Sequence, residues 1–110
     1  MKTALRQGEQ VVKEGAANLQ KVIESVGGRL CLTNRRLIFE AHRFNVQTGT
    51  TEVELSDIQS SRPCWALLLG LVPVWPNALV VLTKQGSKYR FTVWGRHAWI
   101  AEIEAQQRAE

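Results

Sequence analysis

The sequence GGRLCLTNRRLIFE, residues 27–40, decides the fold of this chain. Apolar and polar residues alternate on both sides of a polar corner, a pattern typical of two paired β-strands. Asn34 tolerates a positive φ angle and can bond its own backbone, so Asn34 and Arg35 suit a two-residue connection. We expect a β-hairpin whose corner is kept in water by Arg35 and Arg36. The apolar positions of its two strands are Leu30, Leu32, Leu37 and Phe39.

Upstream of this hairpin, the sequence predicts two further strands. The first covers residues 9–14 and is expected to end at Gly15. The second covers residues 16–26, whose apolar residues also fit a helical period. We prefer a strand there because the run leads directly into the double glycine at 27–28. The apolar residues of this run are Leu19, Val22, Ile23 and Val26.

Downstream of the hairpin, the pattern predicts three more strands. Residues 52–56 alternate cleanly, and Asp57-Ile58 is expected to end that strand. Residues 78–83 are almost continuously apolar, which suits a strand that is covered on both faces. A turn signal at 84–87 follows, and residues 88–93 alternate again. The last two strands should form a second hairpin.

The period changes near the end of the chain. From Arg96 onward, Trp99, Ile100 and Ile103 follow helical spacing and the other side of the segment is polar. Gly95 suits the entry of a helix. We therefore expect a curled antiparallel sheet whose open end is plugged by one terminal helix, with the indole of Trp99 as the plug.

Length and composition predict one domain, spanning residues 1–110 with a core at about 9–103. A chain of 110 residues buries roughly two-thirds of its unfolded surface, so it needs neither a metal nor a disulfide. Cys31 and Cys64 have no partner at metal-ligand spacing, and we expect two free thiols in a reducing compartment. The N-terminal residues lack a secretory signal, and no stretch is long enough for a spanning helix. We expect a cytoplasmic protein, with peripheral attachment to a membrane as an option.

The net charge of +4 and the isoelectric point of about 9.5 permit attraction to phosphates without requiring it. The basic residues are spread along the chain, and aromatic residues are not interleaved with them as in single-strand nucleic-acid platforms. A nucleic-acid binder driven only by charge is therefore ranked last among the hypotheses.

Several blocks of this sequence resemble the GRAM family of the pleckstrin-homology-like superfold, in the form of a small stand-alone member of bacterial type. The resemblance implies a mainly β fold: a seven-stranded antiparallel, partly open barrel or orthogonal sandwich, capped by a C-terminal α-helix. Members of the family are lipid- or protein-binding modules, often at membranes. The matching blocks are Gly28 to Phe39, Glu54 to Ile58, Gly86, Tyr89, Phe91 to Val93, Gly95-Arg96 and Trp99-Ile100.

The sequence departs from the lipid-binding relatives at one place. Pleckstrin-homology domains that grip phosphoinositides concentrate basic residues around the first loop between strands. The corresponding residues 13–18 contain only one lysine, Lys13, beside one glutamate, Glu14. A tight headgroup pocket is not expected there.

The oddest segment is 65–76, which contains no charged residue. It is too short to span a bilayer, and Pro73 and Pro76 argue against a long helix or a central strand. Three interpretations compete, of which we favour the first. The side chains cover one mouth of the barrel as core, form an exposed patch for a partner or for self-association, or dip into a membrane interface with Trp65 and Trp75 at headgroup level.

No constellation points to catalysis, a cofactor or a metal. His42 and His97 have no Asp, Glu or Cys at a recognised spacing. Glu52 and Glu54 share one strand face, which is normally solvated. No phosphate-binding loop or dinucleotide glycine pattern occurs, and we expect a protein that is not an enzyme.

The leading hypothesis is an adaptor module that attaches to an anionic membrane surface or to a protein partner. The alternative is a structural, homo-oligomeric unit that associates through segment 65–76 or a sheet edge. Lys88 and Arg90 share the strand face opposite Tyr89 and Phe91, so both should be exposed. The binding candidates are Arg35, Arg36, Arg43, Lys88, Arg90, Trp65, Leu69, Leu71 and Trp75; Trp99, Phe39 and Phe91 are structural candidates.

Overall fold

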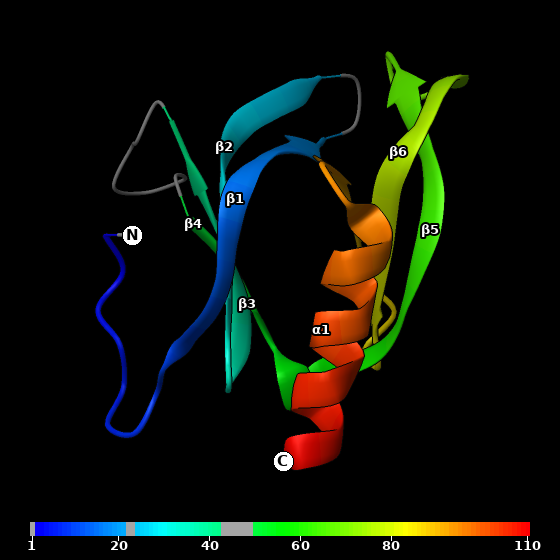
Figure 1. The fold of residues 1–110 in the computed structure, drawn as a ribbon. Helices are drawn as coiled ribbons and strands as arrows, with labels where there is room; N and C mark the ends of the chain where they lie inside the picture. The colour runs from blue at the N-terminus through cyan, green and yellow to red at the C-terminus, as the bar shows by residue number, and fades with distance from the viewer. Residues whose placement is uncertain (1, 22–23, 43–49) are drawn as a thin grey trace.

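The fold is a seven-stranded antiparallel sheet that curls into a half-barrel around one terminal helix (Figure 1). A computed structural model describes residues 2–21, 24–42 and 50–110 of the chain. The strand order in the sheet is β4-β3-β2-β1-β7-β6-β5, so β4 and β5 are the edges. The elements are β1 (Val11–Gln20), β2 (Ser25–Thr33), β3 (Arg36–Ala41), β4 (Thr50–Glu54), the 3₁₀-helix η1 (Leu55–Asp57), β5 (Ile58–Leu68), β6 (Val72–Thr83), β7 (Lys88–Val93) and α1 (Arg96–Ala109).

The hairpin predicted from residues 27–40 is confirmed as β2 and β3. Leu30 pairs with Phe39 and Leu32 pairs with Leu37, and Asn34-Arg35 makes the turn. The apolar residues of this hairpin face the core, where the ring centroids of Phe39 and Phe91 lie 5.9 Å apart. The second predicted hairpin is also confirmed, because β6 pairs with β7 from Ala78 to Leu82.

Helix α1 closes the half-barrel with two buried side chains. Gly95 precedes the helix in the left-handed region at φ 67°, which glycine adopts without strain. Trp99 is 2 % exposed and Ile103 is fully buried, so one face of the helix fills the core. The Lys13 ammonium lies 5.2 Å from the centre of the Trp99 ring, on the β1 side. The structure therefore places the indole where the sequence expected a plug.

Two expectations about the first strand are wrong. β1 does not end at Gly15, which pairs with Leu30 in the middle of the strand. A Cβ at position 15 would lie 3.4 Å from the indole of Trp99, so this residue packs against that ring. The predicted strand 16–26 is instead divided between β1, which ends at Gln20, and β2, which begins at Ser25; Lys21 N–H donates to Glu24 O at 2.7 Å between them. Val22 and Ile23 lie outside the described residues.

The bounds of the strands overturn two further expectations. Residues 13–18 lie within β1 and not in a loop, so the comparison with the headgroup loop of the lipid-binding relatives does not apply to them. Asp57 and Ile58 do not end the strand predicted at 52–56 either, because β4 ends at Glu54. Asp57 ends η1, and Ile58 begins the long edge strand β5.

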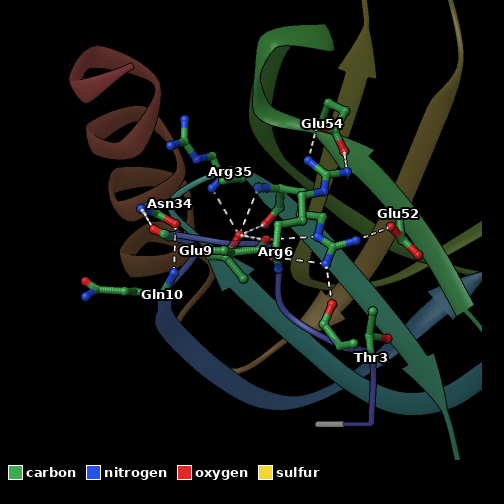
Figure 2. Close-up of polar contacts among 12 residues, drawn as sticks. Thr3, Arg6, Glu9, Gln10, Asn34, Arg35, Glu52 and Glu54 are labelled. Atoms are coloured by element: carbon green, nitrogen blue, oxygen red, sulfur yellow. Dashed lines mark hydrogen bonds and ion pairs between the residues drawn. The ribbon is translucent and has the colours of Figure 1, made fainter.

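The expectation that Arg36 is solvated is wrong, because its side chain is only 6 % exposed. Its guanidinium donates two hydrogen bonds to Glu9 (2.8 and 3.0 Å) and a third to Glu52. It donates a fourth to the carbonyl of Ala4 at 2.9 Å. Figure 2 shows this cluster between the N-terminal segment and the strands. Alternation along β3 placed Arg36 on the outer face, but the N-terminal segment then covers that face.

The N-terminal segment 2–10 is bonded along the outer face of the first half of the sheet. Glu40 accepts hydrogen bonds from the backbone N–H groups of Lys2 and Thr3. Arg6 donates two hydrogen bonds to Glu54 at 2.6 and 2.7 Å (Figure 2). Glu52 and Glu54 thus form ion pairs, although the sequence predicted a purely solvated face. Cys31 is buried on this outer face, and burial is the main cause that raises the pKa of its thiol to about 11.

Candidate binding surface

Segment 65–76 forms parts of two paired strands, β5 and β6. β6 pairs with β7 only as far as Ala78. Beyond Ala78, β5 and β6 continue together as a two-stranded ribbon. We call this extension, residues 65–77, the arm; its free end stands at the upper right of Figure 1. Pro73 and Pro76 fit because this part of β6 pairs only with β5, and shifts in register accompany the pairing. The sequence argument excluded prolines from a central strand, but the arm is not central.

The arm exposes its large apolar side chains. Leu71 is 82 % exposed, Trp75 68 % and Leu69 62 %, and no described part of the chain covers them. The interpretation of this segment as core over one mouth of the barrel is therefore wrong. Each fully buried Leu or Val would contribute about 1.5–3 kcal/mol, a gain that this fold leaves unused. The other exposed apolar residues of the arm are Trp65, Leu68, Val72 and Val74.

The tip of the arm holds a leucine in an unfavourable backbone conformation. Leu69 has φ 55° and Gly70 has φ 73°, and the N–H of Leu71 donates to the carbonyl of Leu68 at 3.0 Å. Two consecutive positive φ angles are the geometry of a type I′ turn, for which Asn-Gly is the preferred sequence. An L-residue with a large side chain costs roughly 1–2 kcal/mol in this region. The tip of the arm thus carries an exposed apolar side chain on a strained backbone.

A cationic groove lies on the outer face of the second half of the sheet, next to the arm. Arg62 on β5 pairs with Val80 on β6, and Val80 pairs with Arg90 on β7, so the three form one row across the sheet. Lys88 occupies the neighbouring row, opposite Leu82. The groove has a volume of about 370 Å³. Val80 and Leu82 form its half-buried floor, and neither belongs to the core cluster.

Two arginines fasten the arm to the body of the protein. Arg90 Nη1 donates to the carbonyl of Trp65 at 2.6 Å, and Arg96 Nη1 donates to the carbonyl of Cys64 at 2.7 Å. Arg96 is the first residue of α1, so the arm begins beside the N-terminal end of the helix. Cys64 lies beside these cations, but burial outweighs them and raises the pKa of its thiol. Cys31 and Cys64 are both free thiols.

The acidic residues of the chain leave one long interval free of negative charge. No Asp or Glu occurs between Asp57 and Glu102, whereas this interval holds five basic residues. Because the whole chain has a net charge of +4, the remaining residues together carry −1. The interpretation that basic residues are simply spread along the chain missed this gap in the acidic residues. The five basic residues are Arg62, Lys84, Lys88, Arg90 and Arg96.

The structure brings together six of the nine candidates named from the sequence. These are Lys88, Arg90, Trp65, Leu69, Leu71 and Trp75, on the groove and the arm. Arg35 is exposed but lines a hollow with Gln106 and Glu110 at the C-terminal end of α1, about 20 Å of helix away from the arm. Arg36 is buried, and Arg43 lies outside the described residues.

Two residues of this surface were missed by the sequence argument. Trp94, which follows β7 directly, is 90 % exposed and was not singled out. It lines a hollow together with Asn77 at the base of the arm. Arg62 was noted only as a neighbour of the apolar segment. The acid-free interval from 58 to 101 is the signal that could have identified Arg62.

Other chemistry is not indicated by the described residues. Among them, no group of three or more His, Cys, Asp or Glu side chains is placed to hold a metal ion. Within the same residues, no helix combines the length and apolar character needed to cross a bilayer.

Comparisons with known proteins identify the fold. No model of a protein family and no curated protein matches the sequence. Among solved structures, the N-terminal PH domain of Vps36 superimposes with a TM-score of 0.71 at 18% identity, over 96% of this chain and 84% of that one. The N-terminal PH domain of human ARAP2 gives 0.66 at 14% identity, over 99% and 87%. The C-terminal domain of an unknown protein from Leishmania infantum gives 0.75 at 17%, over 92% and 86%. The chain thus has a pleckstrin-homology-like fold.

Proposed function

We propose that this protein is a non-catalytic adaptor module that attaches to a membrane surface through its arm. The observation that carries the proposal is the projection of large apolar side chains, Trp75 and Leu71 foremost, beyond the body of the sheet. Tryptophan favours the boundary between headgroups and acyl chains, where its ring is apolar and its N–H stays hydrated. An arm of this kind lies in the interface without crossing the bilayer.

The charges next to the arm support a lipid surface as its counterpart. Three basic residues of the acid-free interval from 58 to 101, Arg62, Arg90 and Arg96, lie beside the base of the arm. Each Lys or Arg close to an anionic membrane contributes about 1 kcal/mol of attraction. A protein partner would have to supply both an apolar pocket and a compensating acidic rim, whereas an anionic bilayer supplies both at once.

Self-association through the adjacent sheet edge is less well supported. β5 is the edge strand, and Pro63 lacks the N–H that an added strand would need. Arg62 beside it places a positive charge on this edge strand, and charged side chains on an edge discourage pairing with another chain. The homo-oligomeric alternative is therefore not favoured.

The resemblance to the GRAM family fits this function and adds a family hypothesis to the fold. Under it, the chain is a GRAM-type adaptor that works at the cytoplasmic side of a membrane, without catalysis or a cofactor. The carry-over is limited to the fold and the general class of ligand.

The test is co-sedimentation with vesicles of phosphatidylcholine alone and of phosphatidylcholine mixed with phosphatidylserine. We expect binding that increases with phosphatidylserine and decreases with salt. Trp75→Glu should weaken it by about tenfold or more, since a charge replaces an inserted indole. Gln85→Glu is the matched control, because it adds the same charge at the exposed β6–β7 turn.

Two results would contradict the proposal. One is the absence of vesicle binding by a folded protein at low salt. The other is light scattering that shows a concentration-independent dimer in which Trp75→Glu yields a monomer, since the arm would then bind a second copy.

A further inference from the structure

We infer that the groove between Arg62, Lys88 and Arg90 is a binding site for a phosphate group on the headgroup of a membrane lipid. The inference rests on the proposed function and assigns a ligand to the face beside the arm. The site lies on the outer surface of β5, β6 and β7, and its Arg90 pairs with Gln20, the last residue of β1.

The pairing of the strands sets the width of the site. Arg62 and Arg90 flank Val80 in one row, so their Cα atoms lie about 10 Å apart across two strand spacings. Lys88 precedes Arg90 by two residues on the same face, about 7 Å along β7. Three long cationic side chains on these positions can converge above the floor of Val80 and Leu82. The separation suits one phosphate group with several charged oxygens.

The cations of the groove are not neutralised by the rest of the described chain. In that part of the chain, none of the three forms an ion pair with a carboxylate, and β5, β6 and β7 carry no acidic residue. Arg36, in contrast, is saturated by Glu9 and Glu52. The hydrogen bond from Arg90 to the Trp65 carbonyl uses one of its five N–H donors and holds the guanidinium at the groove. The groove therefore has positive charge in place before any ligand arrives.

The arm fixes the source of the phosphate as a lipid. Trp75 pairs with Ala66, which lies four residues from Arg62 along β5, a distance of about 13 Å. The guanidinium of Arg90, which lines the groove, donates to the carbonyl of Trp65 at the base of the arm. The arm and the groove are therefore adjacent. When this surface lies on a membrane, the indole at headgroup level brings the groove to the layer of phosphates.

The geometry favours a phosphomonoester over a phosphodiester. Three cations around one site match the two negative charges of a monoester better than the single charge of a diester. Binding should therefore be stronger to vesicles that contain phosphatidic acid than to vesicles that contain the same surface charge as phosphatidylserine.

The experiment measures the affinity of Arg62→Gln and Lys88→Gln for three sets of vesicles: phosphatidylcholine alone, with phosphatidylserine, and with phosphatidic acid. We expect each substitution to weaken binding to phosphatidic acid vesicles about fivefold and to leave binding to phosphatidylcholine unchanged. Lys84→Gln and Arg35→Gln are the controls, because each removes one exposed charge near the C-terminal end of α1. They should change binding less than twofold.

The outcomes separate this inference from the function on which it rests. If all vesicles bind but Arg62→Gln and Lys88→Gln behave like the two controls, the groove is not the phosphate site and the arm alone attaches the protein. If no vesicles bind, the proposed function fails and the inference fails with it. Whether the bound phosphate belongs to a lipid is tested by titrating the protein with glycerol 3-phosphate. The NMR chemical shifts of the backbone amides of β6 and β7 report the binding. Saturation by this soluble ester at micromolar concentration without vesicles would overturn the assignment to a lipid.

Discussion

Arg90 on β7 donates a hydrogen bond of 2.6 Å to the main-chain carbonyl of Trp65, and this bond joins the cationic groove to the base of the apolar arm. The bond crosses from β7 to β5 over the intervening strand β6. It explains why Arg90 is only partly exposed while Lys88, on the same face, is exposed. The two parts of the proposed membrane surface are therefore mechanically connected.

Loss of this connection is the first prediction. Arg90→Met should lower the free energy of unfolding by about 1 kcal/mol, the usual net contribution of a partly exposed bond. The amides of the arm should also exchange faster with solvent. Lys88→Met is the matched control, since no side-chain bond of Lys88 to the described residues is observed. Equal effects of the two variants in chemical denaturation and hydrogen exchange would contradict a role for the bond.

The strained tip gives a second prediction, in which stability and binding move in opposite directions. Leu69→Asn creates Asn-Gly at two positive φ angles, and the stability should increase by about 1 kcal/mol. The same change removes an apolar side chain from the arm, so vesicle binding should weaken. Denaturation and co-sedimentation of the same preparation check both. A variant that is less stable would show that the left-handed conformation of Leu69 carries no strain.

The third prediction concerns the closest approach of two strands. A Cβ on Gly28 would lie 2.2 Å from the carbonyl oxygen of Glu40, and a backbone atom cannot move aside cheaply. Gly28→Ala should therefore cost about 3 kcal/mol or more. Gly27→Ala should cost less than about 1 kcal/mol, because its nearest neighbours are the side chains of Asn18 and His42. Thermal melts of both variants make the comparison, and similar losses would refute the placement of Gly28.

Two tryptophans provide the fourth prediction. Trp99→Ala should destabilise the protein by about 3–5 kcal/mol because it empties the centre of the core. Trp94→Ala, at a position that is 90 % exposed, should change the stability by no more than about 0.5 kcal/mol. Chemical denaturation measures both. A loss below about 1 kcal/mol for Trp99→Ala would be incompatible with an indole that seals the half-barrel.

The fifth prediction concerns acid. The hydrogen bonds from Arg36 hold the pKa of Glu9 at about 2, against an ordinary value of 4.5. Below pH 4.5 the unfolded chain therefore takes up a proton that the folded protein does not. This stabilisation, on the order of 2–3 kcal/mol, is complete above about pH 5 and is lost as the pH falls toward 2.

Glu9→Gln tests this link between Glu9 and acid stability. The variant should be less stable at neutral pH, since Arg36 loses its buried partner. Its stability should also fall less steeply between pH 5 and 2. Glu40 and Glu54 remain with lowered pKa values, so some acid sensitivity stays. Urea titrations at several pH values measure the free energy of unfolding of both proteins. A decrease between pH 5 and 2 that is as steep in the variant as in the original protein would rule out a major role for Glu9.

The fold could be predicted from the sequence where local pattern and tertiary pairing agree. The alternation around Asn34 and the helical spacing of Trp99 and Ile103 are short-range signals, and both were read correctly. The division between β1 and β2 was missed because a single apolar pattern runs across it in the sequence, formed by Leu19, Val22, Ile23 and Val26. Gly15 was read as the end of a strand, although it pairs with Leu30 within β1 and lies against Trp99 from the far end of the chain.

The binding surface could be predicted only in part, for a different reason. The apolar character of 65–76 was plain, but burial depends on which elements lie beside a segment, and the sequence does not state that β7 stops short of the arm. Arg36 shows the opposite case. Its alternation pointed outward, yet the N-terminal segment covers it and supplies Glu9 as a partner. Local pattern reports the face of a strand and cannot report what covers it.

The uneven distribution of charge has a kinetic consequence. The interval from 58 to 101 has a net charge of +5, and the other residues together carry −1, so the molecule has an electric dipole moment. Near a negatively charged surface this dipole exerts a torque while the two are still about a Debye length apart, roughly 8–10 Å at physiological salt. The protein would therefore reach such a surface already oriented with its arm toward it. Added salt would lower the association rate constant more than it raises the dissociation rate constant.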